Sequence, residues 1–165
     1  MLPKLVITDI DGVWTDEGMF YTPDGDYMKR FCVKDGMAVM MLRYNNIPVA
    51  IITGENSPIV QSRAEKLKIE YCFLGVKDKV AVARLLCDTM GITLDEVAFI
   101  GDDVNDLKLL RLVGQSASPA NTPSYIKSEV KYVTEARGGN GAFREFVEKI
   151  LADNNVLQST IEEMY

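Results

Sequence analysis

The stretch Leu5-Val6-Ile7-Thr8-Asp9-Ile10-Asp11-Gly12 decides the fold, because a short apolar run ends directly in two aspartates and a glycine. Similar apolar runs rich in branched side chains recur at residues 49–52, 71–74 and 97–100. Helical patterns lie between these runs, at residues 36–44, 57–68, 77–90 and 104–112. Strands that alternate with helices over short loops predict an α/β fold with a doubly wound, Rossmann-like parallel sheet. Ligands of such sheets bind beyond the carboxyl ends of the strands.

Residues 18–32 depart from this alternation. They contain two short runs around the turn Pro23-Asp24-Gly25, which predicts a β-hairpin flap after the first strand. The chain has 165 residues without a repeat, a low-complexity tract or a linker, and this length suits one domain. We therefore expect residues 1–165 to form a single domain, with the polar residues 153–165 as a loosely held tail.

The composition is that of a soluble globular protein, with 47% hydrophobic and 25% charged residues. The formal net charge of −6 disfavours nucleic acid and anionic membrane surfaces as partners. No apolar stretch approaches the roughly 18 residues of a transmembrane helix, and the early aspartates do not fit a signal peptide. The separated cysteines, Cys32, Cys72 and Cys87, fit neither a disulfide framework nor a zinc site, so we expect a cytoplasmic protein.

Histidine is absent from the chain. Its absence excludes Ser-His-Asp catalysis, Cys-His catalysis and every proton relay through imidazole. Acid–base chemistry must then use carboxylates, lysine, tyrosine or cysteine. Carboxylates that follow predicted strands are the first candidates, because ligands bind at that edge of the sheet.

Four polar signals lie at the ends of predicted elements. In chain order they are Asp9 with Asp11, Thr53-Gly54, Lys79, and Gly101-Asp102-Asp103 with Asp106. Each signal alone is weak, since carboxylates in such turns often only cap helices, as Asp103 could do for the helix that follows. Independent caps, however, need not all fall at the carboxyl ends of alternating strands. The joint pattern therefore favours one functional site.

These side chains suit phosphoryl transfer assisted by Mg²⁺. Asp9, Asp102 and the backbone carbonyl of Asp11 could supply the oxygen ligands that Mg²⁺ prefers. Lys79 and the Thr53 hydroxyl could stabilise the phosphoryl oxygens. Without histidine, we expect the two carboxylates of the first motif to divide two tasks. One would be a nucleophile that forms an aspartyl-phosphate, and the other a general acid and base.

The motifs, in this order, resemble those of the haloacid dehalogenase superfamily of phosphotransferases over essentially the whole chain. The resemblance is carried by Asp9-x-Asp11-Gly12, the apolar run ending in Thr53-Gly54, Lys79, and Gly101-Asp102-Asp103-x-Asn105-Asp106. It implies that Asp9 is the nucleophile, while Asp11 protonates the leaving group and then activates water. It places Thr53 and Lys79 on the phosphoryl group. The implied Mg²⁺ ligands are Asp9, Asp11 and Asp102, with Asp103 and Asp106 in supporting positions.

Among these phosphotransferases the chain resembles the capless members. The intervals on either side of Thr53 hold only the hairpin, two helices and a strand, which leaves no room for a cap domain. Residues 12–16, 34–36 and 138–145 look like those of octulosonate 8-phosphate phosphatases and their nine-carbon relatives. This resemblance implies a homotetramer whose hairpins pack together and whose neighbouring subunits help to close each site. An apolar hairpin in solvent also requires a covering partner.

The identity of the substrate depends on the residues after Thr53. An arginine typically follows the Thr-Gly pair in octulosonate phosphatases, whereas this chain has Glu55, with Arg63 and Lys66 further on. The pattern is similar to that of members acting on 9-phosphates of nine-carbon keto sugar acids, KDN or N-acetylneuraminate, and implies such a substrate. Gly54 and Glu55 would contact the sugar, and Arg63 and Lys66 its carboxylate. Octulosonate 8-phosphate is the alternative, and the basic pair is then an ordinary solvated helix face.

A receiver-like phosphoacceptor, or a non-catalytic relative, is the alternative from a different class. Receivers also use acidic residues, threonine, lysine and Mg²⁺ on a doubly wound sheet. They carry an adjacent acidic pair after the first strand, whereas here the spaced pair Asp9 and Asp11 comes first and the adjacent pair Asp102 and Asp103 comes late. This order favours a phosphatase that acts on a small-molecule sugar phosphate.

Overall fold

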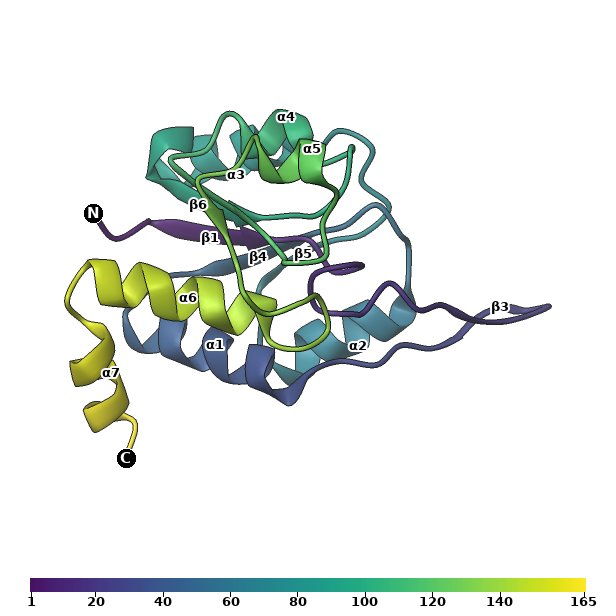
Figure 1. The fold of residues 1–165 in the computed structure, drawn as a ribbon, viewed down its shortest axis with the longest axis horizontal. Helices are drawn as coiled ribbons and strands as arrows, with labels where there is room; N and C mark the ends of the chain where they lie inside the picture. The colour runs from purple at the N-terminus through teal and green to yellow at the C-terminus, as the bar shows by residue number, and fades with distance from the viewer.

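A six-stranded parallel sheet forms the centre of the protein in the computed structural model, which describes residues 1–165 (Figure 1). Its strands lie in the order β5-β4-β1-β6-β7-β8. Their bounds are Leu5–Thr8 (β1), Val49–Ile52 (β4), Tyr71–Phe73 (β5), Val97–Ile100 (β6), Gln115–Ser118 (β7) and Tyr132–Val133 (β8). The chain builds outward from β1 in both directions, so the predicted doubly wound fold is confirmed. Its topological switch point lies between β1 and β6.

Helices cover both faces of the sheet (Figure 1). One face carries α1 (Val33–Tyr44), α2 (Pro58–Lys66) and α6 (Ala142–Asp153), and the other carries α3 (Lys79–Met90), α4 (Leu107–Leu110) and α5 (Ser124–Lys127). Alternate strand residues point into two separate apolar cores, so Val6 packs with α1 and α6, whereas Ile7 packs with α3. No helix combines the length and the apolarity needed to cross a bilayer.

Local capping determines where α3 begins and ends. The Asp78 side chain accepts the backbone N–H of Ala81 at 3.1 Å, and Gly91, with φ of 65°, ends the helix in the left-handed region. Thr93 and Glu96 then form the expected capping box around the short 3-10 turn η1 (Leu94–Glu96) before β6. The first cap places Lys79 as the opening residue of α3.

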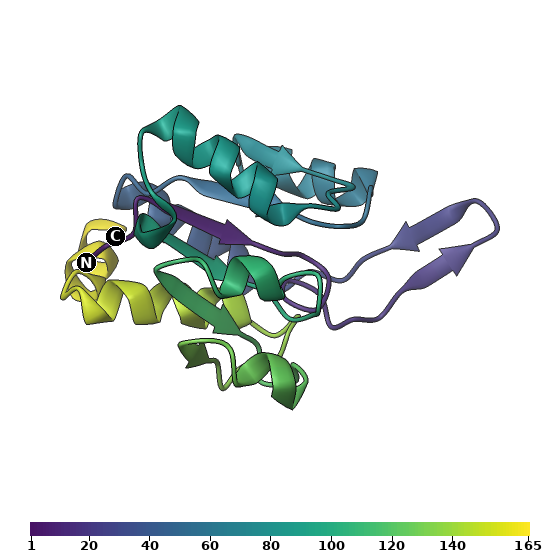
Figure 2. The ribbon, with the colours of Figure 1, turned by 90° about the horizontal axis from the view of Figure 1, so that it is seen from above.

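The expected hairpin consists of β2 (Phe20–Thr22) and β3 (Gly25–Met28) and projects away from the sheet (Figure 2). Gly25 has a φ of 114°, which permits the tight turn between the strands. An ion pair stabilises the base of the hairpin, where the Arg30 guanidinium lies 3.0 Å from the Asp16 carboxylate. Large apolar side chains are exposed on it, namely Met19, Phe20, Tyr21, Tyr27 and Met28.

The C-terminal segment differs from its prediction. Residues 153–165 are not a loosely held tail, because they contain α7 (Leu157–Glu163), which packs against α1 and α6. Ile161 and Met164 lie against the core, and the Asn45 side chain donates a hydrogen bond to the buried Thr160 hydroxyl at 2.8 Å. Apolar residues at helical spacing outweigh the polar composition of this segment.

Candidate active site

The candidate active site lies at the carboxyl edge of the sheet, where the neighbouring strands β4, β1 and β6 end. Asp9 follows β1 directly, Thr53 follows β4, and Asp102 follows β6 after one glycine. These three residues line a cavity of about 270 Å³. The other lining residues are Asp11, Gly12, Glu17, Met19, Gly54, Glu55, Asp103 and Asn105. The strand ends therefore bring three of the four predicted motifs to one cavity.

A second hollow, of about 300 Å³, opens at the opposite edge of the sheet. It is lined by residues near the amino ends of β4 and β5, including Val49 and Tyr71. Glu70 is its one carboxylate. Because it holds no cluster of carboxylates, we assign the chemistry to the carboxyl edge.

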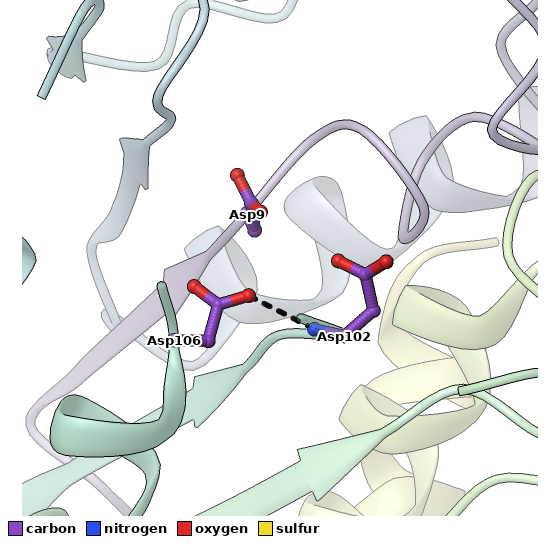
Figure 3. A group of neighbouring side chains, drawn as sticks. All are labelled: Asp9, Asp102 and Asp106. Atoms are coloured by element: carbon purple, nitrogen blue, oxygen red, sulfur yellow. Dashed lines mark hydrogen bonds between the residues drawn. The ribbon is translucent and has the colours of Figure 1, made fainter. Parts of the chain in front are cut away.

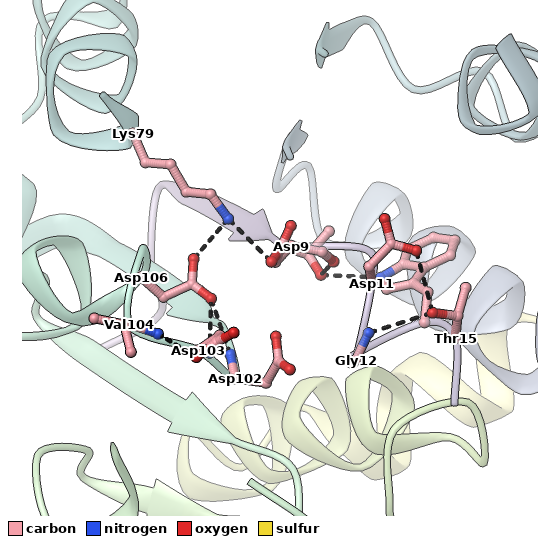
Figure 4. Close-up of polar contacts among 11 residues, drawn as sticks. Asp9, Asp11, Gly12, Thr15, Lys79, Asp102, Asp103, Val104 and Asp106 are labelled. Carbon is pink, nitrogen blue, oxygen red and sulfur yellow. Dashed lines mark hydrogen bonds and ion pairs between the residues drawn. The ribbon is translucent and has the colours of Figure 1, made fainter. Parts of the chain in front are cut away.

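Lys79 joins two aspartates beneath this cavity (Figure 4). Its Nζ lies 3.0 Å from Asp9 Oδ2 and 2.6 Å from Asp106 Oδ1, and the three side chains are at most 6% exposed. Burial alone would lower the pKa of Lys79, but the charges of Asp9 and Asp106 outweigh burial and raise it. Lys79 therefore stays charged and orients the Asp9 carboxylate.

Asp106 links Lys79 to the loop after β6 through hydrogen bonds. While its Oδ1 accepts a hydrogen bond from Lys79, its Oδ2 accepts hydrogen bonds from the backbone N–H groups of Asp102 at 3.0 Å and Asp103 at 3.2 Å (Figure 4).

Gly12, on the loop after β1, lies very close to Asp102. It has a φ of 84°, and a Cβ there would lie 1.9 Å from Asp102 Oδ2. Only glycine lets the loop after β1 pass so close to Asp102.

Asp11 lies on the loop after β1 and is held through one carboxylate oxygen. Its Oδ1 accepts a hydrogen bond from Lys29 Nζ at 2.6 Å and from the Thr15 hydroxyl at 3.4 Å. Its Oδ2 is buried and has no hydrogen-bond partner. Figure 4 shows the Asp11 and Thr15 side chains side by side. One oxygen of Asp11 is thus fixed, and the other has no partner in the protein.

Burial and mutual repulsion raise the pKa of two carboxyl groups in the site. Burial, and then the charge of Asp106, raises the pKa of Asp9 to about 7, against the opposing effect of Lys79. Burial, and then the charges of Asp9 and Asp106, raises the pKa of Asp102 to about 8. One lysine therefore does not balance the negative charge of the three carboxylates.

The donor atoms fit Mg²⁺. Carboxylate oxygens of Asp9, Asp102 and Asp106 lie within 4.8 Å of one another (Figure 3). Asp9 Oδ1 and Asp102 Oδ1 are buried without a hydrogen-bond donor. Such oxygens are the ligands that a hard divalent cation prefers, and a cation would offset their repulsion. Asp9 and Asp102 would hold Mg²⁺, whereas both oxygens of Asp106 already accept hydrogen bonds.

Two predicted substrate residues lie apart from the cavity. Arg63 and Lys66 are in the last turn of α2 and are absent from the cavity lining. The Arg63 guanidinium instead lies 5.7 Å from the centre of the Phe31 ring, and Lys66 is exposed. Because α2 starts at the carboxyl edge and runs back along the sheet, its last turn is carried away from the site. Glu55 and Gly54, in contrast, do line the cavity.

The sequence reasoning missed three residues at the base of the hairpin. Glu17 and Met19 line the cavity, and Lys29 reaches Asp11. A lysine next to an exposed strand has the pattern of an ordinary surface charge, so no local signal distinguished Lys29. Its contact with Asp11 depends on how the hairpin leaves the sheet.

Comparisons with known proteins agree with this geometry. The family described as haloacid dehalogenase-like hydrolase matches residues 27–114. The 3-deoxy-D-manno-octulosonate 8-phosphate phosphatase KdsC of Haemophilus influenzae is 40% identical over 148 residues, which cover 90% of this chain and 82% of that protein. The phosphatase of the same name from Yersinia pestis is 34% identical over 155 residues, covering 94% and 83% of the two chains.

Solved structures extend the similarity to the whole fold. A 3-deoxy-D-manno-octulosonate 8-phosphate phosphatase from Moraxella catarrhalis, crystallised with magnesium, phosphate and KDO, superposes with a TM-score of 0.93. It is 36% identical, and the match covers 99% of this chain and 94% of that one. The cobalt-bound Haemophilus influenzae enzyme has a TM-score of 0.90 at 39% identity, with 94% and 91% of the chains covered.

Proposed function

The chain belongs to the haloacid dehalogenase-like hydrolase family, as a phosphatase similar to the KdsC enzymes, and we propose that it hydrolyses 3-deoxy-D-manno-octulosonate 8-phosphate. Mg²⁺ is its cofactor, and a small sugar phosphate is its substrate. The proposal rests on one observation above all. Asp9 has one oxygen fixed by Lys79 while its other oxygen is buried at the cavity without a donor.

In the proposed reaction, Asp9 attacks the phosphorus atom. A bond forms between an Asp9 carboxylate oxygen and phosphorus as the bond from phosphorus to the sugar oxygen breaks. Asp11 Oδ2 donates a proton to the departing sugar oxygen. Asp11 then takes a proton from water as the water oxygen bonds to phosphorus and the aspartyl-phosphate bond breaks, which releases phosphate and regenerates Asp9.

Positive charge and fixed donors hold the phosphoryl group in this scheme. Lys79 uses two of its three N–H groups on Asp9 and Asp106, so one remains for a phosphoryl oxygen. Thr53 and Gly54, which follow β4, line the cavity, and in this scheme the Thr53 hydroxyl and the loop amides donate to the other phosphoryl oxygens. Mg²⁺, when bound, supplies the charge that stabilises the phosphoryl oxygens among the carboxylates.

The expectation of a nine-carbon 9-phosphate substrate is wrong. The relatives at 34–40% identity are named for the eight-carbon octulosonate 8-phosphate, which was the alternative. The basic pair that suggested a nine-carbon acid, Arg63 and Lys66, does not line the cavity. Glu55 does line it, and we assign it to the hydroxyl groups of the octulosonate.

Oligomerisation through the hairpin is a second part of the proposal. Phe20, Tyr21, Tyr27 and Met28 are 44%, 63%, 69% and 47% exposed. A projecting two-stranded hairpin with these side chains is not stable in water alone, and packing against the hairpins of other copies would cover them. A homotetramer satisfies this need, with neighbouring subunits beside each cavity.

The test is phosphate release by the purified protein. We expect Mg²⁺-dependent hydrolysis, with a higher kcat/KM for octulosonate 8-phosphate than for N-acetylneuraminate 9-phosphate or a hexose 6-phosphate. Chelation of the metal should abolish turnover, and added Mg²⁺ should restore it. Absence of turnover on the octulosonate, or a preference for nine carbons, would contradict the assignment.

A further inference from the structure

Lys29 is the one side chain of the hairpin base that reaches the candidate acid–base residue. It follows β3, and its neighbours in the chain, Met28 and Arg30, are exposed. The Lys29 side chain is only 3% exposed, and its Nζ lies 2.6 Å from Asp11 Oδ1 and 3.6 Å from Asp26 Oδ2. A lysine side chain that is buried on an otherwise exposed hairpin indicates a specific contact.

The contact with Lys29 makes the two oxygens of Asp11 unequal. Oδ1 accepts the charged hydrogen bond from Lys29, and the Thr15 hydroxyl approaches the same atom. Oδ2 has no partner in the protein. Oδ2 is therefore the oxygen left without a protein partner, because Oδ1 is occupied by an ammonium group that has only donors to offer. Oδ2 is also the atom that the proposed reaction uses.

We propose that Lys29 is a positioning residue that fixes Asp11 so that Oδ2 meets the leaving oxygen of the substrate. This inference rests on the proposed function, since it assigns the proton transfer to Asp11. Lys29 acts through Asp11 and contacts neither the phosphoryl group nor the sugar. It also couples the hairpin to catalysis, because the hairpin supplies a group that orients a catalytic carboxylate.

Two other roles for Lys29 make different predictions. A lysine that binds the substrate's anionic groups would mainly affect KM. If Lys29 only anchored the hairpin, loss of another anchoring residue would have the same effect as loss of Lys29. Arg30 is the nearest such residue. Arg30 pairs with Asp16 at 3.0 Å from the next position in the chain and does not touch Asp11. Arg30→Met is therefore a matched control for Lys29→Met.

The experiment compares two substrates that differ in their need for a proton. Departure of the octulosonate alkoxide requires a general acid, whereas p-nitrophenolate leaves without one. First-turnover rates are measured by rapid quench for both phosphate esters with the wild type, Lys29→Met, Lys29→Arg and Arg30→Met. General acid catalysis contributes about 10²–10⁴-fold, and loss of its positioning should remove about 10–10² of this for the sugar phosphate.

For Lys29→Met we expect the first-turnover rate on p-nitrophenyl phosphate to change by less than about threefold. The KM of this variant for the octulosonate should change little. Lys29→Arg should recover much of the rate on the octulosonate. Equal losses with both esters, a rise in KM at constant kcat, or the same selective loss in Arg30→Met would overturn the role of Lys29. Failure of the wild type to hydrolyse the octulosonate would instead refute the proposed function. Thermal unfolding of each variant confirms that it is folded.

Discussion

The carboxyl edge of the sheet buries ionisable side chains, whereas the β2–β3 hairpin exposes apolar ones. At the edge, Asp9, Lys79 and Asp106 are ionisable side chains that are at most 6% exposed. On the hairpin, Tyr21 and Tyr27 are large apolar side chains that are 63% and 69% exposed. Buried ionisable groups are normally paired, and exposed apolar patches are normally covered. Each region thus lacks something that the single chain does not supply.

The carboxyl edge and the hairpin lack different things. The edge has three carboxylates to one lysine and two oxygens without donors, so it lacks positive charge. The hairpin lacks an apolar cover. In our proposal Mg²⁺ supplies the positive charge that the first region lacks, and other copies of the chain cover the second. The regions touch through Lys29, so changes in one should affect the other only modestly.

Removing the nucleophile should have the largest effect. Asp9→Asn keeps the size of the side chain but cannot form the aspartyl-phosphate, so we expect turnover to fall by at least about 10⁴-fold. The variant should remain folded, since it relieves repulsion with Asp102 and Asp106. Phosphate release and thermal unfolding measure the two effects. Asp88→Asn, the same change at an exposed position of α3, is the control. Ordinary steady-state hydrolysis by Asp9→Asn would refute the nucleophile.

Removing the lysine of the edge should cost both activity and stability. Lys79→Met leaves Asp9 and Asp106 buried without their partner, and breaking a buried ion pair costs about 3–5 kcal/mol of unfolding free energy. Loss of its charge from the phosphoryl site should lower kcat by about 10²–10³-fold. Denaturant unfolding without metal and steady-state kinetics with Mg²⁺ test these effects.

Lys77→Met provides the matched comparison for Lys79→Met. Lys77 is exposed and lies two positions earlier in the chain, before α3 begins. We expect its replacement to change stability by less than about 0.5 kcal/mol and to leave turnover unchanged. Similar unfolding free energies for the two variants would show that the buried pairs at the edge do not stabilise the fold.

Changing the hairpin should alter assembly before it alters chemistry. Tyr21→Ser combined with Tyr27→Ser removes two of its most exposed aromatic side chains. If hairpins pack together, this variant should dissociate toward monomers, as measured by light scattering. Its kcat should fall by about tenfold or less, because Asp9 and Lys79 are unaffected. Exposed Tyr125 on α5 offers the control Tyr125→Ser, which should leave the mass unchanged. A wild type that is itself monomeric would contradict the tetramer.

The two regions also differ in how far sequence alone could describe them. Four of the six parallel strands and the identities of Asp9, Thr53 and Asp102 were predictable, because each of these residues directly follows an apolar run or its glycine. The short strands β7 and β8 were not predicted. Parallel strands bring their carboxyl ends to one edge, so position in the chain translates into position in space. Lys79 was predictable for a similar reason, as the first residue of a capped helix.

Contacts that depend on the direction of an element could not be predicted in this way. Arg63 has a suitable charge and spacing, but α2 carries it toward Phe31 and away from the cavity. No local signal distinguishes Lys29 from a surface lysine, but the base of the hairpin turns it toward Asp11. The tail was misjudged because its polar composition hides the apolar side of α7. In each case tertiary packing decided the outcome.

A buried carboxylate outside both regions allows the cost of burial to be measured alone. Asp35 on α1 is fully buried, and burial raises its pKa to about 6, against the opposing effects of the Arg144 backbone N–H and of Arg63, Arg144 and Lys34. The folded state therefore keeps a proton that the unfolded chain loses near its ordinary pKa of 3.8. Stability from this group is full below about pH 4, falls as pH rises through about 6, and is level above that.

Asp35→Asn should remove this decline. Relative to the wild type, we expect the variant to gain about 1–2 kcal/mol of unfolding free energy between pH 4 and pH 7. The amide still accepts the Arg144 N–H, and any cost of its buried NH₂ group is the same at both pH values, so it cancels in the difference. Asp16→Asn should give a small effect of the opposite sign, because the hydrogen bond from Arg30 lowers the pKa of Asp16. Identical pH dependence in Asp35→Asn and the wild type would mean that burial of a carboxylate carries no cost here.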